Sequence, residues 1–549
     1  MEFTVRQISS LEKVRKTDAL THQELRAAAV VAGQRFSYQI ALQAEARVNV
    51  AVQAESSLPG SIRLYAVRDA VMDTPVDGDY PMEDYITHTP GLMPDILVPL
   101  SQTDGRVTVS TAPTTLWISA DAEKDAAPGI YPIRVILTVT KNGGEEVCIR
   151  TAELMLEVVA ADLPEADILY TRWLYADCIA QAHNVEIFSE AHWALLDAYI
   201  AAAADLGINM MLVPVHTPPL DTEIGTARPR VQLVDIEKQG ECYRFGFEKF
   251  RRYIAICRNH GIRHFEIAHM FSQWGAKTAP NIYVTENGEL CHMFGWHTPA
   301  DSPEYVAFLK QYITAIAQEL TALGISENTY FHISDEPKLE NADAYRTASQ
   351  IIRPLIGSSK SMDAISDYHF YEKGLIQCPV TAVRHIHEFL PHNIPNQWVY
   401  YCCGPRTVYT NAFLAMPSYR VRILGFLLYK YDIKGFLHWG FNYYNAVRSL
   451  YPIDPYLTTS GDGAYSSGDP FIVYPGNGCV YPSIRGEVTR EAMQDATLCR
   501  ALEARIGRAA VIAMIDRAAG SELRFDCYPK GNGYIESLRA EMLSRLKEA

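Results

Sequence analysis

The sequence predicts a multidomain protein in which an N-terminal β-sandwich is followed by a (β/α)8 barrel of the TIM type and a C-terminal helical extension. Three observations lead to this prediction. The 549 residues exceed what one hydrophobic core usually holds. Residues 1–162 contain short β-prone runs separated by turn residues. From residue 168 onwards, apolar strands alternate with amphipathic helices, which is the pattern of a parallel barrel.

The N-terminal part is rich in β-branched residues. Strands are predicted at 116–122, 130–140 and 145–159. The sequence KNGG at 141–144 separates the last two and is typical of a tight hairpin. Several short strands with such turns indicate a sandwich, which we assign to residues 1–162. We interpret residues 160–167 as the linker between the sandwich and the barrel.

Eight apolar segments predict the barrel, which we assign to residues 168–450. They lie at 168–176, 208–215, 263–270, 330–334, 362–366, 381–387, 397–403 and 434–440. Helical periodicity occurs at 189–207, 247–261, 302–324, 341–357 and 419–432. The helices after strands five and six are not evident from the sequence. A hairpin is predicted at 284–290, inserted after the third strand.

Residues 451–549 are predicted to follow the barrel and to pack on it. They begin with a loop rich in glycine and serine at 458–470. An extended segment and a long helix follow, and 536–549 form a last amphipathic helix.

The composition restricts the partners. A net charge of −15 with no basic run argues against nucleic acid. No apolar run is long enough to span a membrane, and residues 1–20 lack the apolar core of a secretory signal. The eleven cysteines form no C-x-x-C pair, and the adjacent Cys402 and Cys403 are interpreted as buried thiols packing a strand. We therefore expect a cytoplasmic protein without a cofactor and leave its oligomeric state open, a homo-oligomer included.

Two adjacent carboxylates, Asp335 and Glu336, end the fourth predicted strand and precede Pro337. The carboxyl ends of barrel strands are where active sites lie. Neighbouring strand residues point to opposite faces, so both acids reach one pocket only if the chain leaves its pleat near Asp335, which Pro337 favours. The structural alternative is a helix N-cap followed by a first-turn acid.

Adjacent acids are poorly placed to bracket a sugar from both sides, as most glycosidases require. They suit substrate-assisted hydrolysis, in which the 2-acetamido group of the sugar attacks its own anomeric carbon. One acid then orients that group while the other protonates the leaving oxygen. Two alternatives stay open. One is a glycosidase that pairs Glu336 with a distant nucleophile such as Asp367 or Glu388, and the other is a non-catalytic carbohydrate-binding protein.

Four motifs in order resemble glycoside hydrolase family 123: FHISDEP (331–337), WVYYCCGP (398–405), GFLHWGFNYY (435–444) and the segment 468–491. The resemblance implies a sandwich and a barrel, and β-N-acetylgalactosaminidase activity by substrate assistance on a glycan. It also implies that Asp335 holds the acetamido group, that Glu336 is the general acid/base and that Trp439 lines the sugar pocket. After SIR (483–485) the chain departs from the family's acidic helix and keeps only Arg485, Glu487 and Arg490.

Further residues are candidates for binding the sugar. Tyr400 or Tyr401 could donate to the acetamido carbonyl, and only one of these neighbours can face inward. Trp398 or Trp439 could enclose the acetamido methyl group. Other candidates near strand ends, each with a structural alternative, are Asn442, His216, Asp177, His332, Trp173 and Trp274. A metal site using His216, His269, His385 and His387 is not expected, because no H-x-H follows the first strand.

Overall fold

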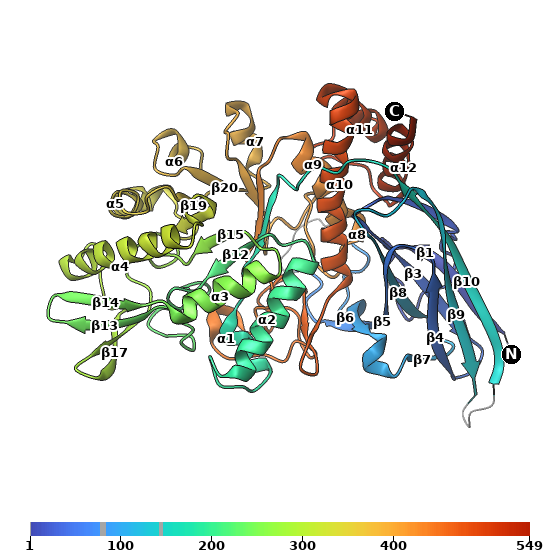
Figure 1. The fold of residues 1–549 in the computed structure, drawn as a ribbon, viewed down its shortest axis with the longest axis horizontal. Coiled ribbons are helices and arrows are strands. Elements are labelled where there is room, and N and C mark those ends of the chain that lie inside the picture. Colours follow the sequence, from blue (N-terminus) through green and yellow to red (C-terminus); the bar gives the residue numbers. More distant parts are fainter. Residues whose placement is uncertain (1, 77–83, 142–145, 549) are drawn as a thin grey trace.

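The computed structural model describes residues 2–76, 84–141 and 146–548. A β-sandwich and a barrel lie side by side, and helix α10 runs between them (Figure 1). This is the predicted fold class. The hairpin predicted at 141–144 falls largely outside the described residues.

The sandwich consists of two five-stranded sheets. The order in the first is β1-β3-β8-β5-β6, with strands Phe3–Ser9, Arg35–Ala44, Thr114–Ala122, Gly60–Met72 and Gly91–Pro99. The order in the second is β2-β10-β9-β4-β7, with strands Ala27–Val31, Glu146–Val159, Gly129–Thr140, Val48–Ser56 and Arg106–Val109. Neighbours are antiparallel except β2 and β10. A 3-10 turn, η1 (Leu100–Thr103), precedes β7.

Eight strands form the closed barrel. They are β11 (Leu169–Arg172), β12 (Met210–Val213), β15 (His264–Ile267), β18 (Thr329–His332), β19 (Lys360–Ala364), β20 (Cys378–Ala382), β21 (Trp398–Tyr400) and β22 (Gly435–His438). All neighbouring pairs are parallel, and β11 closes the ring on β22. Their carboxyl ends therefore meet at one face of the barrel.

Helices of unequal length cover the barrel. They are α1 (Ala176–Ala182), α2 (Glu190–Asp205), α3 (Glu248–Asn259), α4 (Pro303–Ala322), α5 (Ala342–Ile352), α6 (His369–Glu372), α7 (Ile386–Phe389), α8 (Ser418–Arg422) and α9 (Leu424–Lys430), with 3-10 turns η2 (Ser326–Asn328), η3 (Leu339–Asn341), η4 (Leu390–His392) and η5 (Val447–Ser449). The Ser189 and Ser302 hydroxyls accept backbone N–H groups at the starts of α2 and α4. The helices α6 and α7 are single turns, too short to show a sequence periodicity.

The sixth strand differs from its prediction. It ends at Ala382, so His385 lies in the following turn and His387 in α7. The strand predicted at 381–387 is therefore wrong beyond Ala382. The chain instead forms a short helical turn that buries Ile386 and Phe389, which are three residues apart and so lie on one helix face.

A small sheet is inserted near the third strand, in the order β14-β13-β16-β17, with strands Cys242–Gly246, Asp235–Gln239, Ile282–Glu286 and Glu289–Phe294. The predicted hairpin at 284–290 is confirmed as the β16–β17 turn. Asn287 and Gly288 both have positive φ (52° and 84°), as the two-residue turns favoured by Asn-Gly require.

The C-terminal segment connects the barrel to the sandwich. It contains the hairpin β23 (Tyr474–Pro475) and β24 (Val480–Tyr481) and the helices α10 (Ile484–Ile506), α11 (Arg508–Ala519) and α12 (Gly533–Glu548). Buried Arg35 of β3 pairs with Asp205 at the end of α2 (2.6 Å) and with buried Glu487 of α10 (2.9 Å). Buried Arg485 of α10 pairs with Asp95 of β6 at 2.9 Å. Arg485 and Glu487 of α10 thus bind the sandwich.

Among the residues that the model describes, no helix has the length and apolar character needed to cross a bilayer.

Candidate active site

Asp335 and Glu336 lie in the turn that follows β18 and line one cavity of about 220 Å³. Glu336 has φ = 41°, a left-handed conformation that costs a residue with a Cβ about 1 kcal/mol or more. This conformation takes the chain out of the strand pleat at the point where both acids line the cavity. Neither acid caps a helix, because the residues before η3 and α5 are Lys338 and Asn341.

Tyr400 holds one side of Glu336. Its hydroxyl donates a hydrogen bond of 2.5 Å to Glu336 Oε1 from the end of β21. Tyr401, the next residue, is buried away from the cavity, where its ring packs on Phe436 with centroids 4.8 Å apart. Tyr400 is therefore the tyrosine that faces the cavity.

The environment of Asp335 disfavours its charged form. Burial, followed by the neighbouring Glu336 and by Asp363, raises the pKa of Asp335 well above its usual range, whereas His332 acts in the opposite direction. A ligand N–H donating to this carboxylate would favour its ionised form. Asp335 is thus a group whose charge depends on what occupies the cavity.

Six of the fifteen residues that line the cavity are aromatic. Trp439 is held by its indole N–H, which donates to Asp469 at 3.0 Å, and by ring contacts to Tyr443 (5.0 Å) and Tyr465 (5.2 Å). The other aromatic residues of the wall are Tyr400, Trp173, Tyr175, Trp274 and Tyr465. Flat apolar faces beside two carboxylates suit a ring that carries both C–H faces and hydroxyl groups.

A buried polar cluster lies behind Trp173. The two ring nitrogens of His332 reach Glu266 Oε2 (2.8 Å) and Asp363 Oδ1 (3.2 Å), so the imidazole donates from both sides as an imidazolium. Burial lowers the pKa of His332, but the hydrogen bonds that its ring donates to Asp363 and Glu266, together with the charges of these acids, outweigh burial and raise the pKa to about 9. The Trp173 indole N–H also donates to Glu266 Oε2, at 3.0 Å. The cluster therefore fixes a wall of the cavity.

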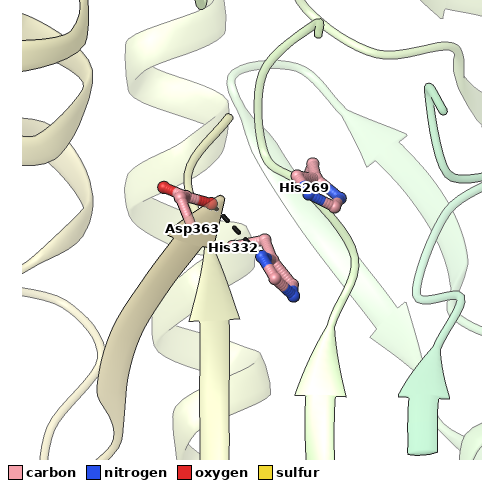
Figure 2. A group of neighbouring side chains, drawn as sticks. All are labelled: His269, His332 and Asp363. Atoms are coloured by element: carbon pink, nitrogen blue, oxygen red, sulfur yellow. Dashed lines mark hydrogen bonds and ion pairs between the residues drawn. The ribbon is translucent and has the colours of Figure 1, made fainter. Parts of the chain in front are cut away.

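His269, His332 and Asp363 lie close enough to suggest a metal site (Figure 2). Their potential ligand atoms lie within 4.8 Å of one another. However, the rings of His269 and His332 are stacked, with centroids 4.2 Å apart and an 18° angle between planes. The in-plane lone pairs of stacked rings run parallel instead of converging, and both nitrogens of His332 already contact carboxylates. The arrangement suits a hydrogen-bonded imidazolium better than a metal.

Six predicted sugar-binding residues, Tyr401 among them, lie outside the cavity. Asn442 bridges the backbone of Tyr175 by accepting its N–H (2.9 Å) and donating to its carbonyl (3.0 Å), which is the turn role that the sequence left open. Trp398 packs deep in the barrel against Tyr330 and Gly435. The Nε2 atom of His216 donates to the His269 carbonyl. Asp177 pairs with buried Arg228, and His332 contacts Glu266. All six side chains are buried, so none of them contacts the cavity directly.

Several cavity residues were missed by the sequence analysis. Asp221 lies in the loop after β12 and accepts from the Tyr465 hydroxyl at 2.7 Å. Its backbone N–H donates to Gln273 Oε1 at 2.7 Å. Tyr465 belongs to the glycine- and serine-rich loop that was placed beyond the barrel. The position of Asp221 after a predicted strand could have indicated a site residue. No sequence pattern indicated that Tyr465 lies at the site.

A larger groove of about 610 Å³ adjoins the cavity and shares Glu336, Tyr400, Cys402 and Cys403 with it. Its other charged residues are Arg384, Arg406 and Glu388, with His385 and His387 nearby. Of the two distant acids considered as nucleophiles, Glu388 lines this groove, where it contacts His385. Asp367 instead accepts from the backbone and ring of His369.

A family model described as "Glycoside hydrolase 123, catalytic domain" matches residues 173–502, more than half of the chain. A family 123 glycoside hydrolase from Clostridium perfringens, whose structure was described in terms of glycolipid glycan hydrolysis, has a similar fold. The TM-score is 0.72 at 16% identity, covering 100% of this chain and 97% of the other.

Two further solved structures are more distant. A family 5 mannosidase from Rhizomucor miehei has a TM-score of 0.34 at 12% identity, covering 63% of this chain and 94% of that one. A family 2 member from Bacteroides cellulosilyticus has a TM-score of 0.27 at 9% identity, covering 79% and 47%. No curated protein matches the sequence. The family match covers seven of the eight barrel strands, β12 to β22, and the acid pair, and the chain belongs to glycoside hydrolase family 123.

Proposed function

We propose that this protein removes terminal β-linked N-acetylhexosamine, with N-acetylgalactosamine as the favoured sugar, by substrate-assisted hydrolysis with retention of configuration. The observation that carries the proposal is that Asp335 and Glu336, which are adjacent in the chain, line one cavity. Two acids placed in this way serve two neighbouring atoms of one sugar.

In the proposed reaction, Asp335 accepts a hydrogen bond from the acetamido N–H of the sugar. The acetamido carbonyl oxygen attacks C1, and Asp335 stabilises the positive charge that develops on the acetamido group. Glu336 donates its proton to the leaving oxygen and later removes a proton from the attacking water. Tyr400 lies beside Glu336 and could turn its hydroxyl towards the acetamido oxygen. Trp439 and Trp173 form faces against which the ring and its methyl group pack.

The two hollows suggest how a longer glycan binds. The cavity of about 220 Å³ is of a size for a single sugar ring, which suits an enzyme that removes terminal residues. Glu336 borders both hollows, so the larger groove lies where a leaving portion would extend. The glycolipid glycans named for the Clostridium perfringens relative are substrates of this kind. We include them, and a cytoplasmic location, as parts of the proposal.

The experiment compares release of 4-nitrophenol from the β-N-acetylgalactosaminide, the β-N-acetylglucosaminide and the β-galactoside. Turnover of the acetamido sugars alone, with inhibition by a thiazoline analogue of the cyclised intermediate, is the expected result. Turnover of the plain galactoside would contradict substrate assistance and require a protein nucleophile. No turnover of any of the three would contradict the proposed specificity, and titration with N-acetylgalactosamine would then test simple binding.

A further inference from the structure

We propose that Cys402 and Cys403 form a chelating dithiol site for thiophilic arsenic(III) compounds, and that its occupation obstructs the catalytic cavity. The two residues are adjacent and follow β21, and their sulfur atoms lie 3.7 Å apart. Both are free thiols and both are partly exposed. This inference does not depend on which sugar the enzyme accepts.

The thiols are accessible from the active site. Cys402 and Cys403 line both the cavity and the adjoining groove, together with Glu336 and Tyr400. The interpretation of these cysteines as buried thiols packing a strand is therefore wrong, because β21 already ends at Tyr400. A group bound to both sulfurs would lie next to the acid that we assign to proton transfer.

The sulfur separation suits chelation better than a disulfide. A disulfide requires about 2.05 Å between its sulfurs, far below the observed 3.7 Å. Trivalent arsenic is pyramidal, and with As–S bonds of about 2.3 Å and an S–As–S angle of about 95° it holds two sulfurs about 3.4 Å apart, only about 0.3 Å closer than they lie here. The dithiol therefore has nearly the spacing that a soft ion demands, and soft ions prefer sulfur ligands.

Backbone contacts fix the two cysteines. The Asn411 side-chain amide donates to the Cys402 carbonyl at 2.9 Å, and the Arg406 Nε–H donates to the Cys403 carbonyl at 2.8 Å. The Cys402 N–H donates to the Gly404 carbonyl at 3.0 Å. Because the loop is held on both residues, less conformational freedom is lost when both sulfurs bind one atom.

The chemistry requires no oxidant. An aryl arsenoxide reacts with two thiols so that two As–S bonds form and both S–H bonds break. The arsenoxide oxygen leaves as water with the two thiol protons, and arsenic stays trivalent. The hydrogen bond with Cys403, followed by burial, raises the pKa of Cys402 well above its usual range, so the thiol that enters this condensation carries its proton.

The test uses phenylarsine oxide with the full-length enzyme and intact-mass spectrometry. We expect one adduct per chain and loss of hydrolysis, both reversed by 2,3-dimercaptopropanol and not by 2-mercaptoethanol at the same thiol concentration. Cys402→Ser and Cys403→Ser each leave a single thiol, which should raise the concentration needed for the adduct by about 10²-fold or more. The matched control is Cys242→Ser, which removes an exposed thiol elsewhere and should leave the adduct unchanged.

Equal adduct formation in the wild type and in either serine variant would overturn the site. An adduct on the wild type with full activity would overturn the obstruction of the cavity. Because adduct mass is measured without turnover, the site can be tested even if no substrate from the panel above is hydrolysed. Failure of the dithiol site and failure of the proposed glycosidase specificity are therefore distinguishable.

Discussion

Tyr400 donates a hydrogen bond of 2.5 Å to Glu336, from the end of β21 to the turn after β18. The two strands are not neighbours in the barrel, since β19 and β20 lie between them. The contact therefore crosses the carboxyl face and orients the acid over the opening shared by cavity and groove. It also identifies which of two adjacent tyrosines belongs to the site.

The acid pair gives the first prediction. Asp335→Asn and Glu336→Gln should each lower kcat by about 10²–10⁴-fold, because one loses charge stabilisation and the other loses proton transfer. The measurement is 4-nitrophenol release from the N-acetylgalactosaminide for Asp335→Asn and sugar release from an N-acetylgalactosamine-terminated disaccharide for Glu336→Gln, with far-UV circular dichroism to show that the fold is intact. Full activity in Glu336→Gln would contradict its assignment as the acid.

Leaving-group chemistry provides a control for this experiment. Nitrophenol departs with little need for a proton, so Glu336→Gln should be less impaired on this substrate than on a disaccharide with a poor leaving group. Asp335→Asn should be impaired on both. Equal losses on both substrates for Glu336→Gln would show that it does not protonate the leaving oxygen.

The two tyrosines form a matched pair for a second prediction. Tyr400→Phe removes a hydrogen bond to a carboxylate, a contact worth about 1.5–3 kcal/mol, and should lower kcat about ten-fold or more. Tyr401→Phe removes a buried hydroxyl outside the cavity and should leave kcat unchanged. Steady-state kinetics on the same substrate measure both effects. A larger kinetic loss in Tyr401→Phe would contradict the assignment.

The buried imidazolium predicts a pH-dependent stability. The pKa of His332 is raised from 6.5 to about 9, which corresponds to about 3 kcal/mol of stabilisation. Because the folded-state pKa is the higher one, this stabilisation is complete below about pH 6.5 and is lost as the pH rises through about 9. Urea unfolding of the wild type at pH 6, 7.5 and 9.5 should show this loss.

The variant His332→Gln isolates that contribution. It should cost roughly 3–5 kcal/mol at pH 6, since Glu266 and Asp363 would lose their buried cation, and this difference from the wild type should shrink at pH 9.5. His260→Gln removes a histidine from a partly exposed pair with Asp197 and should change stability by less than about 1 kcal/mol. A difference for His332→Gln that does not vary with pH would rule out a protonated His332.

The contact between sandwich and barrel gives a fourth prediction. Arg35→Ala leaves buried Glu487 without its cation and should cost about 3–5 kcal/mol in unfolding. Arg134→Ala breaks a pair within the sandwich that is 56% and 42% exposed and should cost about 1 kcal/mol or less. Chemical denaturation of both variants checks this contrast. Similar small losses would mean that the interdomain ion pairs contribute little to stability.

The sequence by itself determined the architecture and the acid pair. Alternation of apolar strands with helical segments predicted the barrel because each element must bury one face, a local requirement that repeats along the chain. The pair at 335–336 could be recognised because its position after a strand and before Pro337 is encoded by adjacent residues. The same local reasoning failed at the sixth strand, where the chain leaves the strand after Ala382 and a single helical turn, too short to show a periodicity in the sequence, buries Ile386 and Phe389.

Only the tertiary structure decided which other residues belong to the site. Tyr465 reaches the cavity from a loop after the last barrel strand and bonds Asp221 after the second, a separation of 244 residues that no local pattern encodes. Asn442 and His332 occupy plausible strand-end positions, yet burial turns their side chains to the backbone and to carboxylates. The position of a residue at a strand end determines where its Cα lies. Packing against distant segments determines whether its side chain lines the cavity or is buried in the core.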